Sequence, residues 1–409
     1  MACAVRLSGF QSQFLGALTL GLFLAVTGPG RGEDTVLHTF AGASGDGALP
    51  RGDVTIAGGL LYGMTSEGGL NNAGSVFRLD PNGSSEALIH SFALGSNPAG
   101  SLVLNGSTFF GMTNGGGTGS VGTIFSLTTA GVYQTLWNFT GSATDGSSPL
   151  GSLVLSGSTL YGMTQFGGTS GTGTIFRIGV DGTGFQVLHS FTGAPSDGSL
   201  PFGSLTLSGS TLYGMTANGG AANGGMLFQI DINTLVFGVL HDFAVGSNPQ
   251  GSLLLSGSDL YGTTSGGGVN GSGTVFRIAT NGASFQELHA FGGTGDGTVP
   301  LGSLTAVDSM LYGTTSAGGA NGQGTVFHLG LDGLGFGLDH SFTGGSGDGA
   351  NPQGSLTVVN GVAYGTTAGG GPNDKGTVFS VAVVPEPGIV ALVIVAGGVL
   401  TLRRRRREW

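Results

Sequence analysis

One unit of about 50 residues recurs seven times along this chain, and the spacing inside the unit constrains the fold more than any other feature. A Tyr-Gly-(Met/Thr)-Thr motif starts at Tyr62, Phe110 (in place of Tyr), Tyr161, Tyr213, Tyr261, Tyr312 and Tyr364. A Gly-Ser-Leu motif, or its variant at Gly52, starts 10 residues before each, and a motif ending in Phe closes 15 residues after it. Since an insertion would shift strand register, these constant spacings predict hydrogen-bonded strands.

Each unit contains four short stretches that are typical of β-strands. In residues 151–202 they are GSLVL, TLYGMT, GTIFRI and FQVLHSF, separated by Gly-rich or Asp-Gly sequences. Four strands in each repeat of about 40–50 residues are characteristic of a propeller blade. Gly accounts for 87 of 409 residues, and no segment shows a sustained helical period with caps. The sequence therefore predicts an all-β fold: a single seven-bladed β-propeller over residues 35–384.

The two ends of the array predict how the ring closes. A Leu-His-x-Phe strand, Leu37 to Phe40, precedes the first unit, whereas no such strand follows Phe379. We expect Val36–Phe40 to form the outer strand of the last blade. That arrangement leaves no unpaired sheet edge between the first and last units.

Histidine and aspartate recur at fixed places and are the candidates for chemistry. The Leu-His-x-Phe motif supplies His38, His90, His189, His241, His289 and His340, with Trp137 in the seventh copy. Equivalent positions on different blades lie too far apart to converge on one zinc ion, so a structural role is favoured. His328 has no repeated counterpart.

The connection after this motif is 8, 11 or 12 residues long, as expected of a surface loop. The longer copies carry an aspartate before glycine, at Asp46, Asp145, Asp197, Asp296 and Asp348. Asp-Gly is a common turn pair, whereas calcium loops supply several oxygens close in sequence. A turn is favoured, and calcium remains the alternative. We predict no catalytic, cofactor-binding or metal-binding residues, although a propeller enzyme with a carboxylate pair stays open.

Charge excludes one class of partner. Residues 35–384 hold 5 basic and 18 acidic residues, hence a net charge of −13. Nucleic-acid binders present basic surfaces, so that class is set aside. The only cysteine, Cys3, lies in the N-terminal segment, and the predicted propeller has no disulfide.

Both termini are typical of export signals. Residues 1–32 are predicted to be a secretory signal peptide, since Arg6 precedes an apolar run at 14–26. Residues 385–409 contain Pro385, Glu386, Pro387 and Gly388, then an apolar run predicted to be a short transmembrane helix, then Arg403, Arg404, Arg405, Arg406 and Arg407. This basic end favours the cytoplasmic side of a membrane. A simple tail anchor is the alternative.

The C-terminal segment resembles the PEP-CTERM sorting signal of Gram-negative bacteria. The resemblance implies export by the secretion machinery, anchoring in the inner membrane, and cleavage near Pro385–Gly388 by an exosortase. The LYGMT/YGTT, GGxxxxGTVF and LHSF segments resemble GloVer repeats, which are found in bacterial surface proteins. That family implies no established enzymatic activity.

These features predict an exported, non-enzymatic protein of the cell surface or extracellular matrix. We expect it to bind polysaccharide or protein partners through loops of the propeller. The alternatives are a propeller hydrolase or lyase acting on polysaccharide, and a structural component of a surface layer; fold alone does not choose among them.

Overall fold

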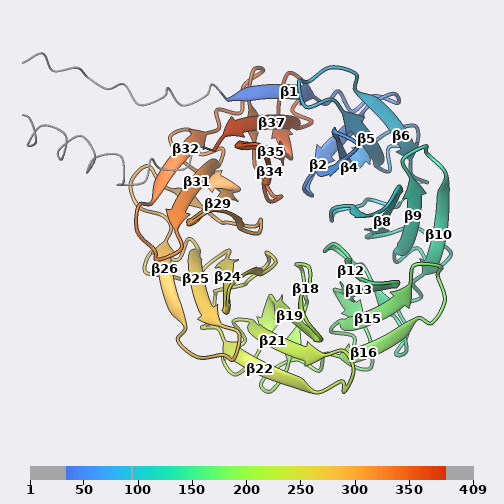
Figure 1. The fold of residues 1–409 in the computed structure, drawn as a ribbon, viewed down its shortest axis with the longest axis vertical. Coiled ribbons are helices and arrows are strands. Elements are labelled where there is room, and N and C mark those ends of the chain that lie inside the picture. The colour runs from blue at the N-terminus through green and yellow to red at the C-terminus, as the bar shows by residue number, and fades with distance from the viewer. Residues whose placement is uncertain (1–33, 94, 384–409) are drawn as a thin grey trace, which may run out of the picture. The chain divides into compact units, whose positions relative to one another are not determined.

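The computed structural model describes residues 34–93 and 95–383, all of which belong to the unit Glu33–Trp409. Every regular element in this part is a β-strand. Seven antiparallel sheets, or blades, follow one another around a central axis, as the fold prediction requires (Figure 1). Six have four strands, and the first gains a fifth. No helix in the described residues is long and apolar enough to cross a membrane.

The strands of each blade are given from the axis outward. Blades 1 to 3 consist of β3 (Thr55–Ala57), β4 (Leu60–Gly68), β5 (Ser75–Leu79) and β6 (Ala87–Ser91); β7 (Val103–Asn105), β8 (Thr108–Thr113), β9 (Thr123–Thr128) and β10 (Tyr133–Asn138); and β12 (Val154–Ser156), β13 (Thr159–Thr164), β15 (Thr174–Gly179) and β16 (Gln186–Ser190).

Blades 4 to 6 consist of β18 (Thr206–Ser208), β19 (Thr211–Thr216), β21 (Met226–Asp231) and β22 (Phe237–Asp242); β23 (Leu254–Ser256), β24 (Asp259–Thr264), β25 (Thr274–Ala279) and β26 (Gln286–Ala290); and β28 (Thr305–Val307), β29 (Met310–Thr315), β31 (Thr325–Gly330) and β32 (Gly337–Ser341). Blade 7 consists of β34 (Thr357–Val359), β35 (Val362–Thr367), β37 (Thr377–Ala382) and β1 (Thr35–Thr39).

Blade 7 therefore takes its outer strand from the N-terminal end of the array, which confirms the predicted ring closure. Strand β1 lies antiparallel to β37, with Val36 opposite Phe379 and Thr39 opposite Thr377 (Figure 1). The strand ends one residue earlier than expected, at Thr39. Pairing the two ends of the array satisfies a sheet edge that would otherwise be exposed.

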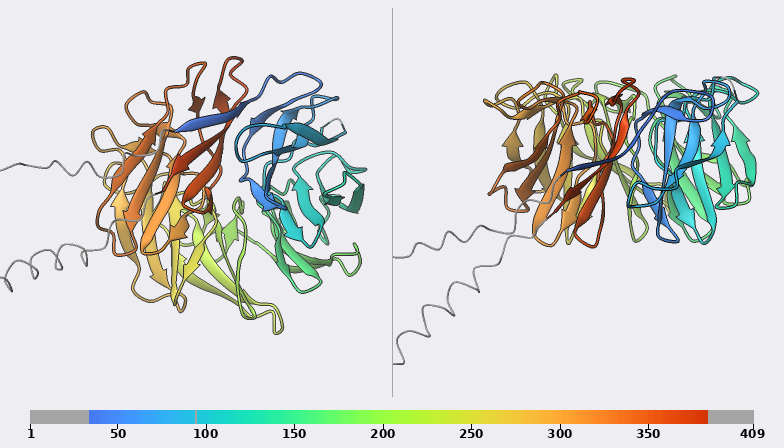
Figure 2. Two further views of the ribbon diagram at one scale, coloured as in Figure 1. Left: turned by 45° about the horizontal axis from the view of Figure 1, so that its top comes forward. Right: turned by 90° about the horizontal axis from the view of Figure 1, so that it is seen from above.

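A short ribbon joins successive units on one face of the ring. Strand β2 (Gly47–Pro50) pairs with β4, and four two-stranded sheets repeat this contact elsewhere. They are β11 (Gly146–Ser147) with β14 (Phe166–Gly167), β17 (Gly198–Ser199) with β20 (Asn218–Gly219), β27 (Gly297–Thr298) with β30 (Ala317–Gly318), and β33 (Gly349–Ala350) with β36 (Gly369–Gly370). The variable connections and the connections between second and third strands thus share one face, called here the loop face; Figure 2 shows the ring from the side.

The core lies between neighbouring blades and explains the Tyr-Gly and Phe motifs. The ring of Phe176 is fully buried and covers Gly162 on the adjacent strand, where a Cβ would lie 2.5 Å from the Phe176 Cζ. Phe191 of the same blade meets Phe228 of blade 4 edge-on, with ring centroids 5.3 Å apart. All seven interfaces repeat these contacts, and burying each Phe contributes about 1.5–3 kcal/mol.

Candidate functional site

A closed belt of hydrogen bonds surrounds the axis. In each blade one backbone N–H donates to a side-chain oxygen of the next blade, at 2.5–2.8 Å, and the seventh bond returns to the first blade. The residues of this serine belt are Asp53, Ser101, Ser152, Ser204, Ser252, Ser303 and Ser355. The Gly-Ser-Leu motif was expected inside the inner strand, but its residues precede that strand and connect the blades.

The glycine of the same motif is required by close packing around the axis. A Cβ on Gly100 would lie 2.4 Å from the carbonyl oxygen of Gly151, and the same contact recurs at all seven positions. Only glycine allows the backbones of adjacent blades to come this close. The motif therefore serves the architecture of the ring.

Within the serine belt, Asp53 is the one acidic member. It faces a cavity of about 490 Å³ lined by residues from all seven blades. Burial raises the pKa of the Asp53 carboxyl, although hydrogen bonds from Ser355 and Ser101 act in the opposite direction. Sequence reasoning did not single out this residue, and the signal was the Gly-Asp-Val variant at Gly52.

The recurring histidines and aspartates occupy separate motifs in the sequence, but in the structure they form pairs. Nε2 of His189 donates to Asp197 Oδ2 at 3.1 Å, and the same carboxylate accepts the backbone N–H groups of Thr192 and Gly198. Burial opposes ionisation, but these hydrogen bonds hold the Asp197 pKa below its usual value. The equivalent pairs are His38–Asp46, Trp137–Asp145, His289–Asp296 and His340–Asp348. The aspartate thus fixes its loop against the outer strand.

The histidine position lies beside an irregularity that all seven outer strands share. The register shifts between Val36 and His38 on β1, and the equivalent shift occurs in every blade. Such a bulge bends a strand and re-aims a side chain. It places each of these side chains, called here the rim residues, next to the following blade; they are His38, His90, Trp137, His189, His241, His289 and His340.

Two rim residues belong to blades with the short loop and have no loop aspartate. Burial lowers the pKa of both His90 and His241, so both rings are neutral at pH 7. Beside His90 the loop face has a cavity of about 320 Å³. Its lining combines the aromatic ring of Tyr133 with hydrogen-bonding groups of Asn71, Ser91, Ser96, Thr123 and Thr135.

The residue four positions before each rim residue covers the rim residue of the preceding blade. Phe237 stacks on His189 with ring centroids 4.0 Å apart and planes 1° from parallel. Five blades present an aromatic ring here: Tyr133, Phe185, Phe237, Phe285 and Phe336. At the two interfaces of blade 7 the position holds a carboxylate instead, Asp34 over His340 and Glu86 beside His38.

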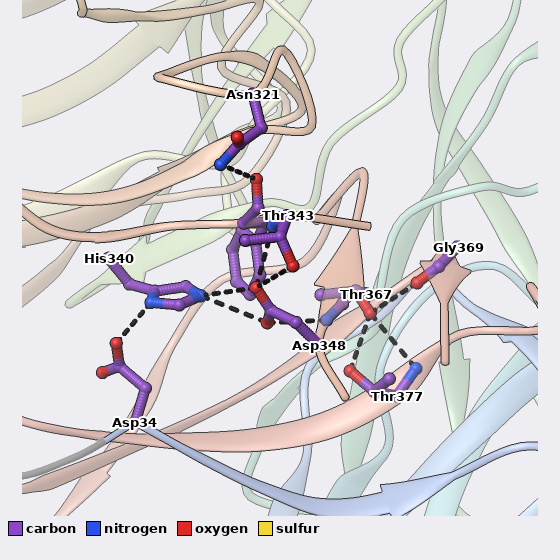
Figure 3. A network of polar contacts seen from close by, with 10 residues as sticks. Asp34, Asn321, His340, Thr343, Asp348, Thr367, Gly369 and Thr377 are labelled. Carbon is purple, nitrogen blue, oxygen red and sulfur yellow. Dashed lines mark hydrogen bonds and ion pairs between the residues drawn. The ribbon is translucent and has the colours of Figure 1, made fainter. Parts of the chain in front are cut away.

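His340 lies between two carboxylates that bind opposite ring nitrogens. Asp34 contacts Nδ1, and Asp348 contacts Nε2 at 3.2 Å (Figure 3). Although burial disfavours the charged ring, the hydrogen bonds and charges of the two acids raise the pKa of His340 to about 9. These three residues line a cleft of about 630 Å³.

At the interface between blades 7 and 1, one histidine and two acidic side chains lie close together. Donor atoms of His38, Asp46 and Glu86 all lie within 4.8 Å of one another. Burial raises the pKa of Glu86, while the His38 ring lowers it. Among the residues described, this is the one group of three such side chains whose geometry could hold a metal ion.

Other sequence expectations have mixed outcomes. His328, which has no counterpart in the other repeats, pairs with Asp339 through Nδ1 at 2.9 Å. The Gly-rich stretches lie in connections between second and third strands, as predicted. Pro385 to Gly388, the five arginines, the apolar run between them and the signal peptide lie outside the described residues, so those predictions stay untested.

Comparison with known proteins identifies the family of the repeat. The family described as Gloeobacter/Verrucomicrobia repeat matches residues 16–225 and 211–387. No curated protein matches this sequence. Among solved structures, an oligogalacturonate lyase from Vibrio parahaemolyticus is similar with a TM-score of 0.53 and 12% identity, over 83% of this chain and 90% of that one.

A puromycin-hydrolyzing peptidase from Mycobacterium tuberculosis also has a TM-score of 0.53 and 12% identity, over 87% of this chain. The match spans 55% of that peptidase, about half of its length. At this level of identity both likenesses show the propeller fold alone.

Proposed function

Because this chain belongs to the Gloeobacter/Verrucomicrobia repeat family, we propose that it is an exported, non-enzymatic propeller that binds neutral polysaccharide on its loop face at the cell surface or in the extracellular matrix. Export rests on the two terminal sequences. Residues 1–32 act as the signal peptide, and Pro385–Gly388 with the five arginines direct sorting by an exosortase.

The cavity beside His90 carries the polysaccharide part of the proposal. Ligand pockets combine aromatic side chains with a few placed hydrogen-bonding groups. Tyr133 and the neutral His90, which stack on each other, form the aromatic part of the lining, and Asn71, Ser91 and Ser96 supply the hydrogen-bonding side chains. The loop after blade 1 is one of the two short loops without an aspartate, and it borders this cavity through Ala93 and Ser96.

The repeat motifs support a display function. Their glycines, serines and phenylalanines are used between blades, in the serine belt and the core. The connections that vary in length between units lie on the loop face. A scaffold of this kind positions variable loops rigidly, which is how many binding proteins are built.

The binding test uses residues 33–384 and a panel of bacterial and plant polysaccharides. A neutral polymer should raise the melting temperature, and His90→Ala or Tyr133→Ala should abolish the rise. His241→Ala is the matched control, since it removes the other short-loop histidine. If the polymer still raises the melting temperature of both His90→Ala and Tyr133→Ala, the proposed site is wrong.

The same panel separates the alternatives. Release of shortened or unsaturated sugars would establish a hydrolase or lyase instead. Self-assembly of the pure protein, with no response to any polymer, would establish a structural surface-layer component.

Export has its own measurement. The full chain should be found outside the inner membrane of a producing Gram-negative cell. When Pro385–Gly388 is replaced by alanines, the protein should remain in the inner membrane. Equal release of both proteins would contradict sorting through this motif.

A further inference from the structure

The acidic interface between blade 7 and blade 1 differs chemically from the other six. His38 lies on β1, the strand that closes the ring, and Asp46 lies in the loop that follows it. Glu86 comes from blade 1, just before β6, at the position that holds an aromatic ring in five other blades. The three side chains bring one nitrogen and two carboxylate oxygens together from both sides of the interface.

One oxygen of this group has no partner. Oε1 of Glu86 is buried and accepts no hydrogen bond within the described residues. A buried, unpaired carboxylate oxygen is costly, and a cation is the partner that would compensate it best. Asp46 is already oriented, because its two oxygens accept the backbone N–H groups of Ala41 at 2.6 Å and Gly47 at 2.7 Å.

We propose that His38, Asp46 and Glu86 form a binding site for a first-row transition-metal dication such as Zn²⁺, which joins the closing strand to blade 1. One imidazole nitrogen with two carboxylate oxygens suits zinc or manganese. Two carboxylates also balance the charge of the dication.

The geometry needs only a small adjustment. Zinc binds such ligands at about 2.0–2.2 Å, which places ligand atoms roughly 3.5 Å apart. The donor atoms here lie within 4.8 Å, so a side-chain rotation of Glu86 closes the set. Backbone donors to Asp46 act as the outer hydrogen bonds that usually orient metal ligands.

The interface between blades 6 and 7 is the internal contrast. His340 also has two carboxylates, but Asp34 and Asp348 occupy Nδ1 and Nε2 on opposite edges of its ring. Both nitrogens are engaged, and no three donor atoms face a common point. The same residue types therefore form an ion pair there instead of a cation site.

The test uses the full-length chain without an affinity tag, freed of metal by a chelator. Titration calorimetry with Zn²⁺ should give one site per chain, and Zn²⁺ should raise the melting temperature. Glu86→Gln should weaken binding about tenfold or more, since even outer partners of metal ligands contribute about 10–100-fold. Asp34→Asn is the matched control and should bind zinc like the wild type.

Glu86→Phe guards against misfolding as an explanation. It installs the aromatic ring of the other blades, so it should fold and stack on His38 while losing the response to zinc. Wild-type affinity in Glu86→Gln or Glu86→Phe would overturn the proposal. A response to Ca²⁺ but not to Zn²⁺ or Mn²⁺ would also overturn it, because calcium prefers oxygen ligands alone.

Discussion

The axis and the rim of the ring follow different rules. At the axis all seven interfaces use the same glycine contact and the same belt hydrogen bond, with Asp53 as the single change of residue type. At the rim, five interfaces stack an aromatic ring on the preceding rim residue, whereas both interfaces of blade 7 use a carboxylate. Backbones at the axis are too close to vary, while rim side chains have room to change chemistry.

The largest effect should come from removing the closing strand. Deleting Thr35–Phe40 leaves β37 as an open edge and removes the buried ring of Phe40. We expect the melting temperature to fall by about 5–10 °C, since several kcal/mol of stability are lost and the unfolding entropy is about 2 cal/mol/K per residue. Calorimetry measures this, and an unchanged melt would contradict ring closure.

A pair of core substitutions tests whether the interfaces of blade 7 are packed as well as the others. Phe40 and Phe191 are both fully buried and both meet a Phe of the next blade edge-on, at 5.2 and 5.3 Å. Phe40→Ala and Phe191→Ala should each cost about 3–5 kcal/mol. Denaturant unfolding should give equal losses, and a much smaller loss at Phe40 would show a weaker closing interface.

The His340 ion pair should make stability depend on alkaline pH. Its pKa is about 9 in the folded protein, above the usual value of about 6.5 for an unfolded chain. Its contribution is therefore complete below about pH 6.5 and is lost as pH rises to about 9. After the reduction caused by solvent screening, we expect the ion pair to contribute about 1–2 kcal/mol to the free energy of unfolding.

Melting curves of the wild type and Asp34→Asn between pH 6 and pH 10 measure this contribution. The variant should be less stable at pH 6, and the difference should shrink towards pH 10. Parallel curves across the range would show that Asp34 does not support the charged ring.

The smallest effect should come from making the axis uniform. Because burial raises the Asp53 pKa, the ionised side chain costs stability that appears as pH rises above the ordinary carboxyl value. Asp53→Ser supplies the hydroxyl that the other six blades use. At pH 7 the variant should be as stable as the wild type or about 1 kcal/mol more stable, with Ser204→Asp as the reciprocal test.

If Ser204→Asp stabilises the ring at pH 7, then the carboxylate is favourable at the axis and this account of Asp53 is wrong. The difference between each variant and the wild type should narrow below about pH 4, where an ordinary carboxyl is protonated.

The amino-acid sequence by itself determined the blade count, the strand order and the closure of the ring. Its constant spacings of 10 and 15 residues reflect hairpins within one blade, where neighbours in space are near in sequence. The extra Leu-His-x-Phe strand before the first unit was sufficient to predict β1 beside β37.

Contacts between blades were decided by the tertiary structure. The sequence shows an aromatic or acidic residue four places before each rim residue, but that residue contacts the preceding blade, about 50 residues away. His38 meets Glu86, and His340 meets Asp34 from the opposite end of the array, only because the ring brings them together. Repeat spacing fixes hydrogen bonding within a blade, whereas side-chain partners across an interface depend on how the closed ring packs.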